Sequence, residues 1–316
     1  MSTVGDGATL VLGGSGFVGR HLVARLVSAG RRVIVPTRQR ERAKHLILLP
    51  TVDVVEVDIH DQAALTRLVR RASVVVSLVG ILNERRRGDF EHVHVELARK
   101  VVAACGVAGV SRLLHMSALN ADPQGPSRYL RTKGEAEAIV ASSGLAWTIF
   151  RPSVIFGRED SFLNLFAKLE RIMPLLPLGS PDARFQPVFV GDVARAFDAA
   201  IDDDATHRQR YSLCGPKVYT LRELVDYVGQ LTGYKRSILP LGPGLSKLQA
   251  RVLEWLPGPL MSRDNLASME RDNVCDGALA ANIGGPRTAL EAVAPGYLAT
   301  GAIKSRYDEF RSQSGR

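Results

Sequence analysis

The sequence is poor in cysteine, and the cysteines it has form no pattern. Cys105, Cys214 and Cys275 lie far apart, whereas disulfide frameworks and zinc sites bring cysteines together at characteristic spacings. We therefore predict no disulfide framework, no structural metal and a reducing compartment. The seven histidines are dispersed as well. His92 and His94 are two residues apart, so they point away from each other on the helix expected there.

Long apolar runs are absent too. No run reaches the length of about 18 residues that spans a bilayer. Only MSTVGDG precedes the first apolar stretch, which is too short for a signal peptide or a transit sequence. We therefore expect a cytoplasmic protein. Any contact with a membrane would be peripheral, at the cytoplasmic face of the inner membrane.

Acidic residues are in the minority. The 32 Asp and Glu stand against 41 Lys and Arg, which leaves a net charge of +9. Such a charge suits a nucleic acid, an anionic membrane, an acidic partner or a phosphorylated ligand. The arginines are scattered, and no RNA-binding or zinc-finger signature accompanies them. Direct nucleic-acid binding is therefore disfavoured.

The first half of the chain alternates short apolar stretches with amphipathic segments. Stretches typical of strands lie at residues 8–14, 32–38, 52–58, 73–80, 112–118 and 146–153. Strands separated by helices predict an α/β fold, a Rossmann-type doubly wound parallel sheet. Gly30, Gly106 and Gly144 stand where these helices are expected to end, because a left-handed residue often closes a helix.

The pattern changes after Gly157. Proline-rich loops and short amphipathic segments follow, without regular strand alternation. We therefore predict a Rossmann domain over residues 1–157, to which the elements near 186–214 return. Residues 158–316 are predicted to form a smaller mixed C-terminal domain that contacts a substrate or a partner.

One amphipathic segment in this second part is LSKLQARVLEWL. Its apolar stripe consists of Leu245, Leu248, Val252, Leu253 and Leu256. Burial of the stripe inside the C-terminal domain is the favoured interpretation. The alternative is a docking surface for a partner or a membrane, in which Trp255 and residues 257–261 also take part.

A glycine-rich turn, GGSGFVG at residues 13–19, joins the first expected strand to the following helix. Glycine permits positive φ angles, a close approach of the backbone to a pyrophosphate and tight packing of helix on strand. The helix N-terminus then presents unpaired amides to the phosphates. We predict a dinucleotide site here, with a tight turn that binds nothing as the alternative.

The end of the second expected strand lacks the acidic residue that usually binds the ribose 2′-hydroxyl of NAD. This segment reads VPTRQR, and no acid precedes Glu41. Arg38 can pair with a 2′-phosphate through its forked donors. NADP(H) is therefore favoured over NAD(H), while Arg40 and Arg42 are expected to be solvated residues at a helix start.

Tyr129 precedes Lys133 by four residues, which places both side chains on one face of an expected helix. Moving a tyrosine pKa from about 10 to near neutrality takes about 4 kcal/mol. A lysine charge about 4 Å away supplies about that much at an effective dielectric constant of about 20. The pair is therefore suited to proton transfer. A packing tyrosine beside a surface lysine is the alternative.

Taken in order along the chain, these motifs resemble the extended and atypical short-chain dehydrogenase/reductases over residues 8–215. The matching residues are Gly13, Gly16, Gly19, Ser117, Tyr129, Lys133 and the stretch RPSVIFG at 151–157. The resemblance implies that Tyr129 exchanges a proton with a substrate oxygen, Lys133 holds the nicotinamide ribose and Ser117 orients the substrate. Active relatives often carry a second hydroxyl residue directly after this serine, whereas this chain has Ala118 there.

A narrower resemblance extends to about residue 275. SRYLRTKGEAE, RPSVIFGREDSFLNLFAKL, QPVFVGDVARA and LPGPLMSRDNLASMERDNV are similar to the nucleotide-binding accessory subunit of respiratory complex I and its bacterial relatives. The resemblance implies a structural NADPH, a link to ubiquinone metabolism, and complex I or another membrane-associated protein as partner. Two alternatives stay open. One is an NADP-dependent oxidoreductase or isomerase that uses Tyr129 and Lys133 on a hydrophobic carbonyl or quinone, and the other is an NADP(H)-sensing regulator.

The predicted site follows from these motifs and from the ends of the expected strands. The catalytic candidates are Tyr129, Lys133 and Ser117. The predicted cofactor contacts are Gly13, Gly14, Ser15, Gly16, Phe17, Val18, Gly19, Arg38, Asp58, Ile59, Val79, Gly80, Lys133, Pro152 and Ser153.

Overall fold

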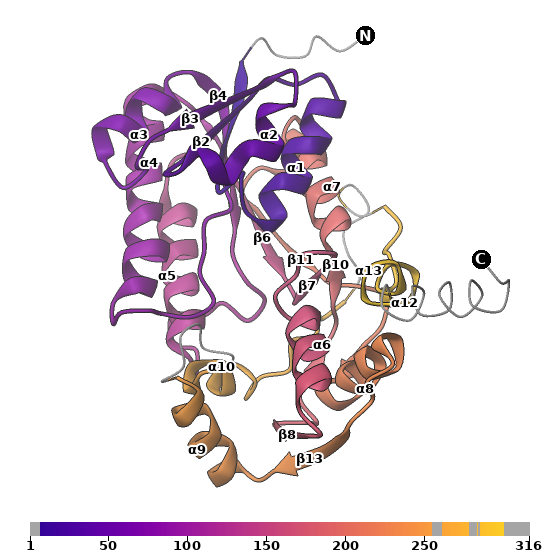
Figure 1. The fold of residues 1–316 in the computed structure, drawn as a ribbon. Coiled ribbons are helices and arrows are strands. Elements are labelled where there is room, and N and C mark those ends of the chain that lie inside the picture. Colours follow the sequence, from indigo (N-terminus) through magenta and orange to yellow (C-terminus); the bar gives the residue numbers. More distant parts are fainter. Residues whose placement is uncertain (1–6, 255–260, 278–282, 284, 300–316) are drawn as a thin grey trace, which may run out of the picture. The chain divides into compact units, whose positions relative to one another are not determined.

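The computed structural model describes residues 7–254, 261–277, 283 and 285–299. The chain forms two compact units (Figure 1). The first comprises Met1–Pro152, Val190–Leu213 and Gly277–Gly285, and the second comprises Ser153–Phe189, Cys214–Asp276 and Pro286–Arg316. The chain therefore leaves the first unit after Pro152 and later returns to it with a helix and a strand.

The first unit holds a seven-stranded sheet in the order β11-β6-β5-β4-β1-β2-β3, and all neighbouring strands run parallel. Its strands are β1 (Ala8–Leu12), β2 (Val33–Thr37), β3 (Val52–Glu56), β4 (Ala72–Ser77), β5 (Arg112–Met116), β6 (Ala146–Pro152) and β11 (Gln209–Leu213). The predicted Rossmann-type fold and its six strands are confirmed. The strand order reverses between β1 and β4, and ligands bind at such a reversal.

Helices cover both faces of this sheet, with α3, α4 and α5 on one side and α1 and α7 on the other (Figure 1). The helical elements of the unit are α1 (Phe17–Ser28), η1 (Arg40–Ala43), α2 (Lys44–Ile47), α3 (Gln62–Val69), η2 (Glu91–Glu96), α4 (Leu97–Ala108), α5 (Arg128–Ser142), α7 (Val190–Ala200) and η3 (Asp204–Thr206). Apolar strands such as β1 are buried on both faces, as a covered parallel sheet requires.

Only one of the three expected helix-ending glycines ends a helix in the expected way. Gly30 follows α1 with φ +77°. The expectation for Gly106 is wrong because α4 continues past it and ends at Gly109, which has φ +74°. The expectation for Gly144 is also wrong, since α5 ends at Ser143 in extended backbone, with the Ser143 hydroxyl donating to Val140 O at 2.6 Å.

The second unit is built from short strands and helices around its own apolar core. Its strands are β7 (Ile155–Phe156), β8 (Leu175–Gly179), β9 (Arg184–Phe185), β10 (Val188–Phe189), β12 (Tyr219–Thr220) and β13 (Ser237–Leu241). Its helices are α6 (Leu163–Ile172), α8 (Leu221–Thr232), α9 (Pro243–Leu253), α10 (Arg263–Ser268), α12 (Leu290–Val293) and α13 (Pro295–Leu298). The strands pair two by two, and the core includes Leu163, Leu176, Leu221 and Val228.

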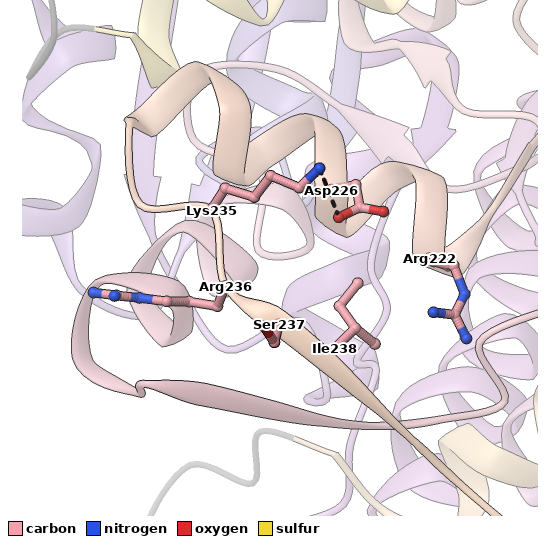
Figure 2. A pocket seen from close by; sticks show the side chains of 6 residues that line it. All are labelled: Arg222, Asp226, Lys235, Arg236, Ser237 and Ile238. Atoms are coloured by element: carbon pink, nitrogen blue, oxygen red, sulfur yellow. Dashed lines mark ion pairs between the residues drawn. The ribbon is translucent and has the colours of Figure 1, made fainter.

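A shallow hollow of 380 Å³ lies in this unit between α8 and β13 (Figure 2). Its cations are Arg222, Lys235 and Arg236. Lys235 pairs with Asp226 at 3.7 Å, and the Arg236 guanidinium donates to the carbonyl oxygen of Glu170 at 2.8 Å. The hollow contains none of the predicted site residues.

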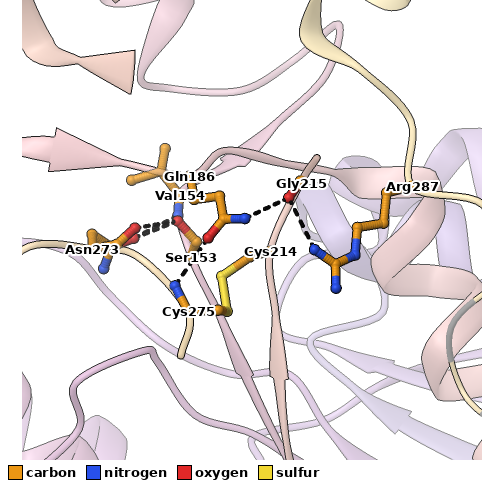
Figure 3. Close-up of a disulfide and its surroundings, with 8 residues drawn as sticks. All are labelled: Ser153, Val154, Gln186, Cys214, Gly215, Asn273, Cys275 and Arg287. Atoms are coloured by element: carbon orange, nitrogen blue, oxygen red, sulfur yellow. Dashed lines mark hydrogen bonds between the residues drawn. A yellow bond between two sulfur atoms is a disulfide. The ribbon is translucent and has the colours of Figure 1, made fainter. Parts of the chain in front are cut away.

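The second unit contains a disulfide between Cys214 and Cys275, whose Cα atoms are 6.1 Å apart (Figure 3). The spacing of the cysteines did not indicate this pair, and the inference of a reducing compartment loses its basis. Gln186 joins the two segments, because its amide donates to Gly215 O at 2.8 Å and its oxygen accepts from the Cys275 amide at 3.0 Å. The pairing depends on tertiary contacts across 61 residues of sequence.

Reducing this disulfide is expected to lower the free energy of unfolding of the second unit by about 2–4 kcal/mol, because the unfolded chain gains conformational freedom. Thermal or urea unfolding with and without a reductant measures the loss. The double variant Cys214→Ser/Cys275→Ser is the control, since the reductant should not change its unfolding further. An equal response of the double variant and the native chain would contradict the prediction.

Candidate dinucleotide-binding site

The predicted site residues of the first unit gather along one edge of the sheet. Because the strands are parallel, the loops after their carboxyl ends lie on the same side. These loops carry residues 13–16 after β1, Arg38 after β2, Asp58 and Ile59 after β3, Val79 and Gly80 after β4, and Ser117 after β5, while residues 17–19 begin α1. Pro152 is the last residue of β6, and Tyr129 and Lys133 lie on α5.

Three positions of the glycine turn after β1 leave no room for a side chain or require a backbone conformation that favours glycine. Gly13 has φ +80°, and a Cβ at Gly14 would come within 2.8 Å of the Val35 side chain. At Gly19, a Cβ would lie 2.2 Å from Gly13 O and 2.6 Å from Gly14 Cα. Helix α1 begins directly after Gly16, so no side chain caps the amides of its first turn. The turn therefore leaves backbone amides at a helix N-terminus for phosphate groups.

Arg38 follows β2 with an exposed side chain, and in the described parts of the chain its guanidinium has no hydrogen-bond or ion-pair partner. Arg40 is also exposed, within η1, as expected for a solvated helix start, whereas the side chain of Arg42 lies outside the described residues. Asp58 accepts from the His60 amide at 3.0 Å. This part of the edge thus offers a cation and no competing carboxylate at the end of β2.

Lys133 is 3% exposed, and its amine donates to Met116 O at 3.1 Å. The amine also lies 3.1 Å from the position that a Cβ would take at Gly80. Burial lowers the pKa of Lys133 from 10.5 to about 8, and Glu137 opposes this shift. The alternative of a surface lysine is therefore wrong. A buried amine beside the loop after β4 can donate to the hydroxyl groups of a bound ribose.

Tyr129 lies one turn before Lys133 on α5 and is partly buried. Its ring contacts Phe90 and His94 edge-on, with centroids 5.9 Å and 5.7 Å away. Burial raises the pKa of Tyr129 to about 12. In the nucleotide-free chain the tyrosine is therefore a weaker acid than in water, whereas proton transfer at neutral pH requires a lower pKa.

Ser117 directly follows the last residue of β5 and is 3% exposed. Its hydroxyl oxygen is buried without a hydrogen-bond partner among the described residues, and its amide donates to Phe150 O at 2.7 Å. A buried hydroxyl without a partner is uncommon in proteins. Ser117 is thus able to bind a ligand oxygen, but the neighbouring Ala118 supplies no second hydroxyl.

Sequence reasoning missed a buried histidine that connects these parts. His94 is 3% exposed and lies in η2, a π-helical turn before α4, and such turns are frequent at functional sites. Its Nε2 accepts from the Ile81 amide at 3.2 Å. The proton of the neutral ring is therefore on Nδ1, which donates to Thr132 Oγ1 at 2.9 Å.

Burial and the nearby Lys133 lower the pKa of His94 to about 2, so the ring stays neutral. The hydroxyl of Thr132 donates in turn to Arg128 O at 3.0 Å. His94 thereby ties the loop after β4 to the helix that carries Tyr129 and Lys133. The sequence offers no signal for this contact, because His94 and Thr132 lie 38 residues apart in different helices.

Ser153 is the one predicted contact that belongs to the second unit. Its hydroxyl donates to Asn273 Oδ1 at 2.5 Å, and the same oxygen of Asn273 accepts from the Val154 amide at 3.1 Å (Figure 3). This hydroxyl is therefore engaged within its own unit.

The residues of the first unit fit a dinucleotide. The glycine turn presents backbone amides at the start of α1, and Lys133 is buried beside the neighbouring loop. Among the described residues, no three His, Cys, Asp or Glu side chains lie close enough together to hold a metal ion. None of the described helices is long and apolar enough to cross a membrane.

Comparison with known families agrees with this geometry. Residues 13–163 match the family model described as NAD(P)H-binding. The prediction of a dinucleotide cofactor is therefore confirmed, without a distinction between NADP and NAD.

Curated relatives match most of the chain. The mitochondrial NADH-ubiquinone oxidoreductase 40 kDa subunit of Neurospora crassa is 32% identical, over 87% of this chain and 74% of its own. The mitochondrial NADH dehydrogenase [ubiquinone] 1 alpha subcomplex subunit 9 of Arabidopsis thaliana is 33% identical, over 83% and 68%. The ceramide reductase of Caulobacter vibrioides is 30% identical, over 81% and 80%.

Solved structures agree on the fold. The UDP-glucuronic acid 4-epimerase of Bacillus cereus superposes with a TM-score of 0.68 at 16% identity, over 92% of this chain and 98% of its own. The UDP-glucose 4-epimerase of Thermus thermophilus gives 0.61 at 22% identity, over 83% and 99%. The chain therefore belongs to the family of NAD(P)H-binding proteins, with the fold of short-chain dehydrogenase/reductases, that includes the 40 kDa subunit and alpha subcomplex subunit 9 of NADH-ubiquinone oxidoreductase.

Proposed function

We propose that the protein holds NADP(H) mainly as a structural cofactor and associates with respiratory complex I or another membrane-associated protein of ubiquinone metabolism. The cytoplasmic face of the inner membrane is the proposed place of this association. The observation that carries the nucleotide part is the buried Lys133 amine beside Gly80, at the sheet edge that also holds the glycine turn. The partner is inferred from relatives that are subunits of NADH-ubiquinone oxidoreductase.

A structural cofactor needs no turnover to be useful. A ligand at about a hundred times its dissociation constant adds about 2.7 kcal/mol to the free energy of unfolding. The single hydroxyl at Ser117, which is followed by Ala118, favours binding over proton transfer. Bound, the nucleotide would supply hydride chemistry at its nicotinamide ring. Lys133 would bind the ribose, and Arg38 would bind the 2′-phosphate.

The preference for NADP(H) depends on Arg38, which is exposed and has no carboxylate partner among the described residues. Arg38→Ala is expected to weaken NADP(H) binding about tenfold or more and to leave NAD(H) binding unchanged, because only NADP(H) carries the 2′-phosphate. Calorimetric titration with both nucleotides measures this. Arg40→Ala, in the same exposed segment, is the control. Tighter binding of NAD(H) by the native chain, with no effect of Arg38→Ala, would overturn the preference.

An active reductase is the second candidate, and the buried hydroxyl of Ser117, which has no hydrogen-bond partner in the described parts of the chain, favours it. The purified protein, with its bound nucleotide identified, is offered carbonyl and quinone substrates while the absorbance of reduced nicotinamide is followed. Under the structural proposal the absorbance stays constant. Oxidation that Tyr129→Phe abolishes would establish the reductase instead.

The partner is tested by native electrophoresis of membranes solubilised in mild detergent. Co-migration of the protein with complex I supports the proposed association. Its absence from the complex I band, with the protein intact elsewhere on the gel, argues against it.

A further inference from the structure

Helix α9 of the second unit buries only one of its faces. Ser246 and Ala250 are 4% and 0% exposed, and the Ser246 hydroxyl is hydrogen-bonded to Leu241 O and Gly242 O. Gln249 donates to Pro177 O of β8 at 2.9 Å. These contacts hold α9 against β8 and the end of β13, and they determine which of its faces is turned outward.

The outward face carries large aliphatic side chains. Leu245, Leu248 and Val252 are 59%, 58% and 61% exposed. At about 100° per residue they occupy a stripe about 60° wide, on roughly the opposite side of the helix from Ser246 and Ala250. The favoured expectation that this stripe is buried inside the C-terminal domain is therefore wrong for these three residues. Leu253 is partly buried, whereas Trp255, Leu256 and residues 257–260 lie outside the described residues.

Basic residues lie along one side of the stripe. Lys247 and Arg251 are both exposed, and the described parts of the chain contain no carboxylate paired with either. The acid on the helix's last turn, Glu254, is engaged by Arg263 at 3.0 Å. Two unneutralised cations therefore stand beside three exposed aliphatic side chains.

The two strands that α9 contacts also carry exposed leucines. Leu175 of β8 and Leu239 of β13 are 44% and 46% exposed. Leu239 pairs with Pro177, two residues from Leu175, so the side chains of Leu175 and Leu239 lie on the same face of the two-stranded sheet. The opposite face of this sheet carries Leu176 and Leu178, which belong to the core of the unit.

We propose that α9 docks on the surface of a bilayer that contains anionic lipid. An aliphatic stripe with cations along one side is the pattern of a helix that lies in the interface, with its apolar side chains among the acyl chains and its cations at the headgroups. An apolar groove on a partner protein would accommodate the aliphatic stripe but would leave the two cations without a partner. The unpaired charges of Lys247 and Arg251 favour an anionic surface. This inference is independent of the nucleotide site. It identifies α9 as the surface through which the proposed membrane association would occur.

The experiment is co-sedimentation of the full chain with vesicles of phosphatidylcholine alone and of phosphatidylcholine mixed with phosphatidylglycerol. Binding to the mixed vesicles is expected, and it should weaken with salt because screening shortens the reach of surface charges. Leu248→Ser/Val252→Ser should lower the bound fraction about tenfold. Lys247→Glu/Arg251→Glu should remove the preference for phosphatidylglycerol.

The matched control is Val107→Ser on α4, a valine that is 65% exposed in the first unit, and it should bind vesicles like the native chain. NADPH binding is measured for every variant, so a failure of the nucleotide proposal is distinguished from a failure of lipid docking. Equal vesicle binding by the native chain and both α9 variants would overturn the proposal. So would a native chain that ignores both vesicle types and instead self-associates through Leu248 and Val252 in light scattering.

Discussion

Gly19→Ala is expected to lower dinucleotide affinity by about a hundredfold or more, which corresponds to about 2.7 kcal/mol. The added Cβ would lie 2.2 Å from Gly13 O and 2.6 Å from Gly14 Cα. Both neighbours are backbone atoms, so no side-chain rotation can relieve the overlap. The glycine turn must move, and the amides at the start of α1 then lose their alignment with the phosphates.

Calorimetric titration with NADPH measures this loss, and circular dichroism shows whether the variant is folded. Gly106→Ala is the control, because Gly106 lies inside α4 with nothing within 4 Å of an added Cβ. Alanine there should preserve binding and favour the helix slightly. If folded Gly19→Ala binds NADPH as the native chain does, the glycine turn is not the phosphate site.

Lys133→Met is expected to weaken NADPH binding about tenfold to a hundredfold while it raises the stability of the nucleotide-free protein at pH 7. The loss of affinity reflects a charged hydrogen bond to the ribose, which contributes about 1.5–3 kcal/mol. The gain in stability follows from burial, which lowers the pKa of Lys133 from 10.5 to about 8. At pH 7 the native chain must bury a charged amine, and methionine removes that cost.

The sign of the pH dependence distinguishes this effect from simple repacking. Between pH 8 and 10.5 the unfolded chain holds a proton on Lys133 that the folded chain has released. The contribution of Lys133 to the stability of the nucleotide-free protein therefore becomes more favourable with rising pH across this window. In Lys133→Met this contribution is absent. The advantage of the variant should thus be largest near pH 7 and shrink towards pH 10.5.

Urea unfolding of both proteins at several pH values, without nucleotide, measures this difference. Lys168→Met is the control, since Lys168 is exposed on α6 and its replacement should change neither stability nor NADPH affinity. A Lys133→Met variant that is less stable than the native chain at pH 7, or that binds NADPH equally well, would contradict the role assigned to this lysine.

The sequence predicted those features that depend on local backbone requirements. Alternating apolar stretches indicated the strands of the parallel sheet, because each strand must be covered on both faces. The glycine turn was recognisable since positive φ at Gly13 and close packing at Gly19 leave glycine as the fitting residue. The spacing of Tyr129 and Lys133 was sufficient to place them on one helix. Helix ends were less predictable, as Gly106 shows, because glycine permits a left-handed turn without requiring one.

By itself, therefore, the sequence determined the Rossmann-type sheet, the glycine turn and the sheet edge proposed for the dinucleotide, all of which follow from residue periods and backbone conformation. Only the tertiary structure decided that Cys214 pairs with Cys275, that His94 links the loop after β4 to Thr132, and that the stripe of α9 faces outward. Each of these depends on residues far apart in the chain. Their packing and hydrogen bonds exist only after folding, so no local pattern encodes them.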